Sequence, residues 1–291
     1  MGITSLQMKI AAEKGVSTAT QYVTPLKLFA NSFRNQEIKK GSAVTVPVFS
    51  YDAENVEFNK TSNNYGSGTT NATGVDIILN KHFVYPISYA DTDFDECDVD
   101  FWKDQGAGIC KVLGEACVGE VNSKLLTSAT EANVKFSAAD AKSKATAANL
   151  FKIAIENNLT PGNTIAVFNP TLYANILGTL DAAVYGTADA IKFGMIPNLF
   201  GFKAVVCDKG LNAELNGMLI DENALGIAAR VPHVDISAYK EVGSMSDEAT
   251  GYPVQFRRYT EPSDGENKLA GTMIFGSAIL NKKGLIGLIE A

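Results

Sequence analysis

A run of carboxylates stands directly ahead of the longest helical pattern in the sequence. Asp91, Asp93 and Asp95 have the spacing of the first three ligands in a calcium-binding EF-hand loop. The remainder of the loop does not match, because Glu96 replaces the glycine at position 6 and Trp102 replaces the glutamate at position 12. Carboxylates at this place also complement the positive N-terminal end of a helix. The run therefore predicts a helix start and no metal site.

Other residue types that carry chemistry are not arranged into a site. His82 lies in a strand pattern and His233 follows a proline, and neither is accompanied by a nucleophile motif or by metal-ligand spacing. Gly106, Gly108 and Gly114 lack the preceding strand and the spacing of a nucleotide-binding loop. We therefore predict no catalytic residue, no cofactor-binding residue and no bound metal, so the chain is not expected to be an enzyme. A carboxylate pair assembled in space stays open, because sequence spacing does not reveal it.

The composition is typical of a soluble globular protein. Hydrophobic residues make up 46% of the 291 residues and charged residues 20%, with a net charge of -7. The start of the chain has no apolar stretch long enough for a signal peptide, which predicts a cytosolic product. The negative charge disfavours sequence-reading contact with DNA, because lysine and arginine drive binding to phosphates.

The cysteine pattern points to neither disulfides nor zinc. Cys97, Cys110, Cys117 and Cys207 form no CxxC pair and have no histidine nearby. A chain of this length buries about 75% of its unfolded surface, so its core has room for such side chains. We predict four buried thiols.

Two alternating strand patterns enclose a long polar segment between residues 41 and 89. The outgoing strand has valine at every second position from Val44 to Val48, and the return has apolar residues at period 2 over Val75–Leu79 and Phe83–Tyr89. Residues 59–74 are mostly asparagine, serine, threonine and glycine. Because a two-stranded ribbon is marginally stable alone, we expect a neighbouring subunit to support this arm.

The rest of the chain alternates between helical and strand patterns. Apolar residues spaced by three and four predict a helix over Val99–Thr127, a rod of about 43 Å. Asn169 and Pro170 supply an N-cap and a first-turn proline for another helix. Arg257 and Arg258, on a late strand, can meet an acidic neighbour. The patterns further predict a helix at 138–157 and strands at 164–168, 202–207, 217–220 with 224–229, 234–239, 254–259, 272–280 and 285–289.

The order of these parts is more specific than any one motif. The segments that carry it are Lys39-Lys40-Gly41-Ser42 to Pro47, Tyr89-Ala90-Asp91, Asp100-Phe101-Trp102, Ala166-Val167-Phe168-Asn169-Pro170, Gly201-Phe202-Lys203-Ala204-Val205-Val206 and Leu219-Ile220-Asp221-Glu222-Asn223-Ala224. Over nearly its whole length the chain resembles the major capsid protein of tailed double-stranded DNA bacteriophages. Encapsulins share this capsid fold.

The resemblance implies an α+β fold of the tailed-phage major capsid type. The implied parts are an N-terminal arm at 1–40, an extended β-hairpin loop at 41–90, a peripheral domain with a long spine helix at 91–137, an α/β axial domain at 138–231 and closing strands of the peripheral domain at 232–291. The extended loop would reach over an adjacent subunit. The candidates for this intersubunit contact are Phe49, Tyr51, Phe58, Lys60 and Tyr65.

The implied function is structural. Copies of the chain would assemble as hexamers and pentamers into an icosahedral shell around double-stranded DNA, without reading the DNA sequence. Scaffolding, portal and decoration proteins are further implied partners, no cofactor or membrane is implied, and the expected location is the virion capsid after assembly in the cytoplasm of a bacterial host. Some relatives join a loop lysine to an asparagine, but we predict no such bond because Lys60 has no matching partner. Two alternatives stay open, namely an encapsulin-like shell of a bacterial nanocompartment and an α/β enzyme or ligand-binding protein built around residues 138–230.

Overall fold

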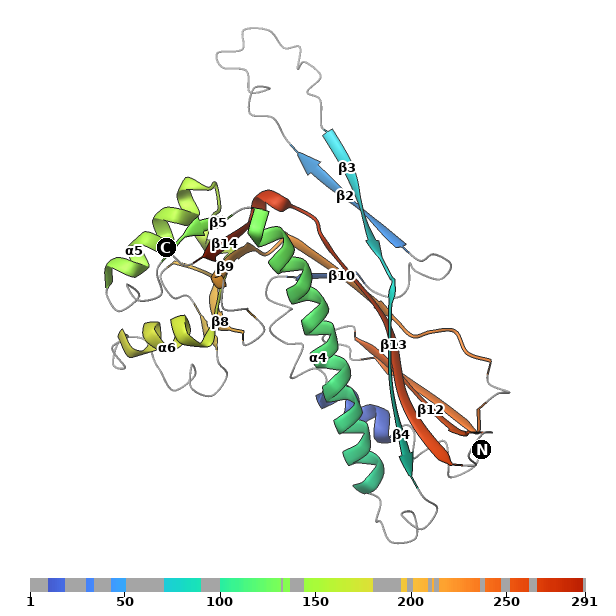
Figure 1. Cartoon of the computed structure of the whole chain (residues 1–291). Helices are drawn as coiled ribbons and strands as arrows, with labels where there is room; N and C mark the ends of the chain where they lie inside the picture. Colours follow the sequence, from blue (N-terminus) through green and yellow to red (C-terminus); the bar gives the residue numbers. More distant parts are fainter. Residues whose placement is uncertain are drawn as a thin grey trace.

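In the computed structural model, the described residues form two sheets and one hairpin (Figure 1). The structure describes residues 10–18, 30–33, 43–50, 71–89, 100–131, 133–136, 144–179, 195–197, 201–208, 211, 215–235, 239–246, 252–261 and 266–289. The first sheet has the order β1 (Ala30–Phe33), β10 (Leu225–Arg230), β13 (Asn267–Ile279), β12 (Pro253–Thr260), β11 (Glu241–Ser246), and β4 (Lys81–Tyr89) also pairs with β13. The second sheet has the order β5 (Asn133–Lys135), β14 (Leu285–Ile289), β9 (Leu215–Asp221), β6 (Thr164–Phe168), β8 (Ala204–Cys207), β7 (Met195–Pro197). The hairpin pairs β2 (Ala43–Ser50) with β3 (Asn71–Ile78).

The helix α4 (Asp100–Glu131) packs along the first sheet and extends to the second (Figure 1). Its 32 residues span about 48 Å, which confirms the predicted long helix and extends it by one turn. Ile109, Leu113, Val121 and Leu125 form its buried stripe. Opposite this stripe, β13 has Gly271, where a built Cβ would lie 2.3 Å from Cγ2 of Ile109. The glycine therefore lets helix and strand approach closely.

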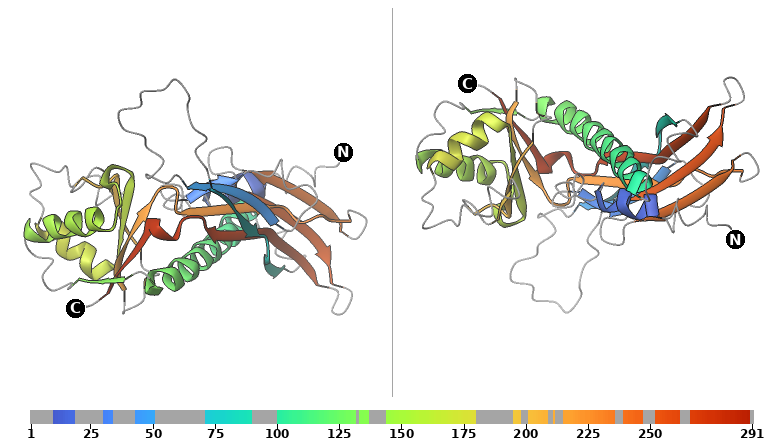
Figure 2. Two further views of the ribbon diagram at one scale, coloured as in Figure 1. Left: turned by 90° about the horizontal axis from the view of Figure 1, so that it is seen from above. Right: turned by 90° about the horizontal axis from the view of Figure 1, so that it is seen from below.

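The second sheet is buried on both faces. Ile165 and Val167 of β6 belong to the core shared with α4, whereas Ala166 and Phe168 face a second core. That second core is completed by α5 (Lys144–Glu156) and α6 (Pro170–Thr179), which lie side by side at the end of the molecule (Figure 2). The predicted cap of α6 is confirmed, because Leu172 N donates to Asn169 Oδ1 at 2.7 Å. No helix in the described ranges has the length and apolar character needed to cross a membrane.

The chain passes between the two sheets more often than the strand patterns predict. The segments 217–220 and 224–229 were expected to continue one another, but β9 lies in the second sheet and β10 in the first. The terminal strand β14, expected with the late strands of the first sheet, pairs with β9 and β5 in the second. The strand predicted at 234–239 is wrong for residues 234, 235 and 239, which have no strand structure, and residues 236–238 lie outside the described ranges. All these segments are apolar, so sequence periodicity does not reveal which sheet receives them. The division into domains stays a prediction.

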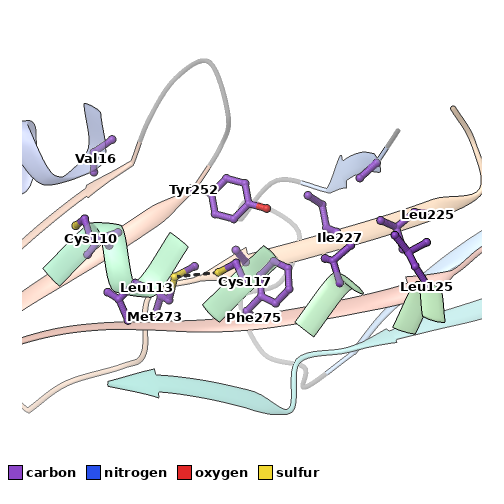
Figure 3. Packing of buried hydrophobic residues seen from close by; sticks show 14 of the residues in the cluster. Val16, Cys110, Leu113, Cys117, Leu125, Leu225, Ile227, Tyr252, Met273 and Phe275 are labelled. Carbon is purple, nitrogen blue, oxygen red and sulfur yellow. Dashed lines mark hydrogen bonds between the residues drawn. The ribbon is translucent and has the colours of Figure 1, made fainter. Parts of the chain in front are cut away.

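Two cysteines of α4 lie in the main core (Figure 3). Cys110 and Cys117 are fully buried, and the thiol of Cys117 donates to the sulfur of Met273 at 3.6 Å. Burial raises the pKa of Cys110 to about 12 and raises the pKa of Cys117 as well. Cys207 is only half-buried, and its pKa is raised by burial and by the nearby charge of Asp208. The prediction of buried thiols is confirmed for Cys110 and Cys117, while Cys97 lies outside the described residues.

We expect iodoacetamide at pH 8 to leave Cys110 and Cys117 unlabelled in the folded protein, because the reactive thiolate is scarce and inaccessible there. Peptide mass spectrometry should find both thiols labelled only after unfolding. Labelling of Cys117 at the rate of a free thiol would contradict the packing of α4 on β13.

A short helix over residues 10–18 crosses α4 at a glycine contact. A Cβ built at Gly106 would lie 2.4 Å from the backbone oxygen of Ala11, and one built at Gly15 would lie 2.6 Å from Sγ of Cys110. Gly108, one half-turn away on α4, has open space around the same position. The glycines of α4 therefore serve different roles.

We expect Gly106→Ala to destabilise the subunit, because the added methyl group collides with the backbone of the crossing helix. The matched change Gly108→Ala should raise the free energy of unfolding by up to about 1 kcal/mol through helix propensity. Urea unfolding of the unassembled subunit measures both. Equal effects of the two substitutions would contradict the helix crossing.

Candidate assembly surface

The base of the β2–β3 hairpin is held by its own chain. Ile77 is completely buried and Leu79 is 7% exposed, and both pack with Ala228 of β10. The backbone of the hairpin also approaches β13 closely, because a Cβ at Gly276 would lie 2.4 Å from the oxygen of Ile78. The base of the arm is therefore supported within the subunit, and the expected support from a neighbouring subunit stays a prediction.

The opposite face of the hairpin is exposed, and we call it the outer face. Strand alternation places Phe49 and Ile78 there, with 55% and 54% of their surface exposed. Thr45 donates to the carboxylate of Asp76 at 2.5 Å across the same face. The register puts the cross-strand pairs Ala43 with Ile78, Thr45 with Asp76, Pro47 with Gly74, and Phe49 with Ala72 on this face. The hairpin therefore has one face for its own subunit and one without a partner among the described residues.

The strand β4 continues this exposed apolar surface along the first sheet. It pairs with β13 over nine residues and, in the part of the chain that the structure describes, with no other strand. Val84 is 51% exposed, whereas Tyr85, 40% exposed, lies opposite Gly271 on the face toward α4. Pro86 is tolerated because β4 is an edge strand. Val84 lies opposite Thr272 on the face of the sheet away from α4. This is the face that the hairpin also covers.

One of the five predicted contact residues falls on this surface. Phe49 is the exposed aromatic side chain of β2, whereas Tyr51, Phe58, Lys60 and Tyr65 lie outside the described residues. Sequence reasoning missed Ile78 and Val84. In both strands the apolar residues alternate with polar ones, and Ile78 and Val84 are apolar residues at positions where the alternation predicts a polar one. This departure from the alternation would have identified them.

An arginine fixes the junction between this surface and α4. The Nε of Arg258 donates to the hydroxyl of Tyr89 at 2.6 Å, and its Nη1 lies 3.2 Å from the carboxylate of Glu241. The guanidinium also lies over the rings of Tyr89 and Trp102, at 5.9 and 5.8 Å from their centroids. One side chain thus joins the end of β4, the first turn of α4, and strands β11 and β12. The expectation of an acidic neighbour is confirmed for Arg258.

The residues considered for catalysis and metal binding are dispersed. His82 shares a 2.8 Å hydrogen bond with the hydroxyl of Thr272, and burial together with the charge of Arg257 lowers its pKa. His233 is exposed in an irregular segment. The carboxylates from Asp91 to Asp98 lie outside the described ranges. Among the described residues, no three metal-binding side chains come together.

Solved structures of shell proteins share this arrangement. No protein-family model matches the sequence, and the comparison with curated proteins finds no significant similarity. The capsid structure of cyanophage P-SCSP1u is 13% identical, with a TM-score of 0.61 over 90% of this chain and 86% of that one. The chain has a phage capsid fold. The capsid of a native GTA particle is also 13% identical, with a TM-score of 0.58 over 94% of this chain and 90% of that one. A virus-like particle from Pyrococcus furiosus is 13% identical as well, with a TM-score of 0.53 over 95% of this chain and 98% of that one.

The likeness to capsid structures extends over most of the chain. The matched structures are capsids, and the matches cover 90% and 94% of this chain. The α+β class and the overall capsid fold predicted from the sequence are confirmed. At 13% identity, the likeness establishes the fold but does not identify which residues contact another subunit.

Neighbouring isoleucines test the two faces of the hairpin. We expect Ile77→Ala to lower the free energy of unfolding by about 2–5 kcal/mol, because it leaves a cavity in a buried cluster. Ile78→Ala removes an exposed side chain and should change it by less than about 0.5 kcal/mol. Urea unfolding of unassembled subunits gives both values. A large loss with Ile78→Ala would show that the outer face is not free in the subunit.

Proposed function

We propose that this chain is the structural major capsid protein of a tailed phage. Copies of it assemble as hexamers and pentamers into an icosahedral shell that encloses the double-stranded DNA genome, with the virion capsid as its location. The observation that carries this proposal is the exposed apolar surface of Phe49, Ile78 and Val84 on a chain with a capsid fold. The register separates Phe49 from Ile78 by six positions of the hairpin, so these side chains are distributed along its outer face, and exposed apolar surface is available to another subunit.

The two faces of the hairpin suit a protein that forms a shell. A closed shell requires heterologous contacts in which one surface of a subunit meets a different surface of the next. The hairpin suits this role, because its inner face anchors it to the first sheet and its outer face is available to another subunit. In this proposal the second sheet with α5 and α6 is the main part of the axial domain, and the first sheet with α4 is the peripheral domain. The chain itself carries out no turnover.

Assembly of the purified full-length chain tests the function directly. We expect sedimentation velocity and negative-stain microscopy to find closed particles of uniform size. Expression in the presence of phage genomic DNA and packaging proteins should yield particles that contain DNA. Empty particles that instead capture a cargo enzyme would favour the encapsulin-like alternative, and a protein that stays monomeric at every concentration would contradict both.

The segment between β2 and β3 provides a sharper test. Ser50 lies opposite Asn71, so a two-residue Asn-Gly turn can replace residues 51–70 without changing the register. We expect the shortened protein to keep the circular dichroism spectrum and thermal midpoint of the full chain, because Ile77 and Leu79 remain in place. Particle formation should fail or give malformed shells.

The control is the double substitution Ile77→Ala and Leu79→Ala, which weakens the base and leaves residues 51–70 intact. It should lower the thermal midpoint, whereas the shortened loop should not. Normal particles from the shortened protein would overturn the role of the arm as a clasp between subunits.

A further inference from the structure

The helix over residues 10–18, which we call the strap, covers part of α4 with little apolar surface of its own. Its fully buried residues are Ala11, Ala12, Gly15 and Val16, and Ile10 at its start is half-buried. Among the fully buried ones, Val16 alone has a side chain larger than a methyl group. Hydrophobic stabilisation grows with the apolar area removed from water, so the apolar contribution that holds the strap is small.

The polar residues of the strap do not strengthen its attachment. Glu13 and Lys14 are exposed, and neither forms an ion pair within the part of the chain that the structure describes. The hydroxyl of Thr18 donates to the backbone oxygen of Lys14 at 3.0 Å, which is a bond within the strap itself. A helix of this length is not stable alone in water, because its nucleation is unfavourable and few hydrogen bonds follow. The strap is therefore helical because it is docked on α4.

The contact with α4 is a close approach of two backbones. A Cβ built at Gly106 would lie 2.4 Å from the backbone oxygen of Ala11. A Cβ built at Gly15 would lie 2.6 Å from Sγ of Cys110 and 2.8 Å from the backbone oxygen of Gly106. Glycines at the crossing thus bring the strap close to α4 without adding side chains that interlock. The strap lies directly over the thiol of Cys110.

The two cysteines of α4 are therefore covered by different parts of the subunit. Val16 and Cys110 lie at the same end of the main core in Figure 3. Cys117, two turns further along α4, donates to the sulfur of Met273 on β13 and is covered by the first sheet. Burial raises the pKa of both thiols, to about 12 for Cys110. Uncovering either one would give it back the reactivity of an ordinary thiol.

We propose that the strap detaches from α4 while both sheets stay folded. Segments with few buried apolar contacts open at a lower free energy than the core, and the strap is such a segment. Its opening uncovers the side of α4 at Gly106 and Cys110 and leaves the stripe of α4 packed on β13. The strap is thus a movable element on a fixed framework. This inference concerns the single subunit and goes beyond the proposed shell function, so its test does not require assembly.

Labelling of the wild-type subunit tests the proposal first. Unassembled protein is treated with iodoacetamide at pH 8 at several urea concentrations below the unfolding transition, and peptide mass spectrometry gives the rate for each thiol. We expect Cys110 to react at least about tenfold faster than Cys117 under these conditions. The rate for Cys110 should also depend less steeply on urea, because detachment of the strap exposes less surface than global unfolding.

Two substitutions at opposite ends of the core in Figure 3 separate the two kinds of opening. Val16→Ala weakens the docking of the strap and should raise the labelling rate of Cys110 about tenfold. Leu225→Ala, at a completely buried position of β10, weakens the sheet core. It should raise the rate for Cys117 at least about tenfold and leave the rate for Cys110 unchanged, because it destabilises the subunit equally with the strap docked or detached.

Three outcomes would overturn the inference. Equal acceleration of both thiols by Leu225→Ala, or equal urea dependence of both in the wild type, would show that the strap opens only when the subunit unfolds. Labelling of wild-type Cys110 at the rate of a free thiol without urea would show that the strap does not cover α4.

Discussion

The packing of α4 against β13 is the interaction on which the rest of the structure depends. β13 is the longest of the described strands, with 13 residues, and it pairs with β10, β12 and β4. The stripe of α4 covers one of its faces. Gly271 brings the helix close to the strand, and Gly276 does the same for the hairpin on the opposite face. Small residues on both faces of one strand therefore let a helix and a hairpin pack on the same framework. Disturbing this strand would disturb every other part of the first sheet.

This framework separates what stabilises the subunit from what is left for other molecules. The face of the first sheet toward α4 contains the large apolar side chains and the paired Arg258. The opposite face has the anchored base of the hairpin, the exposed Val84 and Arg257, which donates hydrogen bonds to the neutral Gln255 and Tyr239. Exposed apolar groups and unpaired buried charges both reduce the stability of an isolated subunit. Further exposed apolar side chains lie elsewhere in the described residues, on α4, α5 and β11.

The second sheet differs from the first, because both of its faces are covered within the subunit. Its strands connect the core of α4 with the core of α5 and α6, so the two halves of the molecule share one continuous layer. Phe151 and Ile155, one turn apart on α5, are exposed apolar side chains in the described part of this half. The C-terminal strand β14 strengthens the connection by pairing with β9, far from its sequence neighbours in the first sheet.

The sequence alone determined the local structure of this protein. The valines of β2, the apolar stripe of α4 and the cap formed by Asn169 are set by interactions within a few residues, so periodicity and capping rules identify them. The order of these elements was enough to indicate the capsid fold. The sequence could not assign β10 and β14 to their sheets, because a buried strand has the same apolar pattern beside any partner. Nor could it distinguish Arg257 from Arg258, which differ only in the side of the sheet that each one faces. Tertiary structure decided both, because long-range pairing determines which side chains are covered, which are paired and which are left for a neighbour.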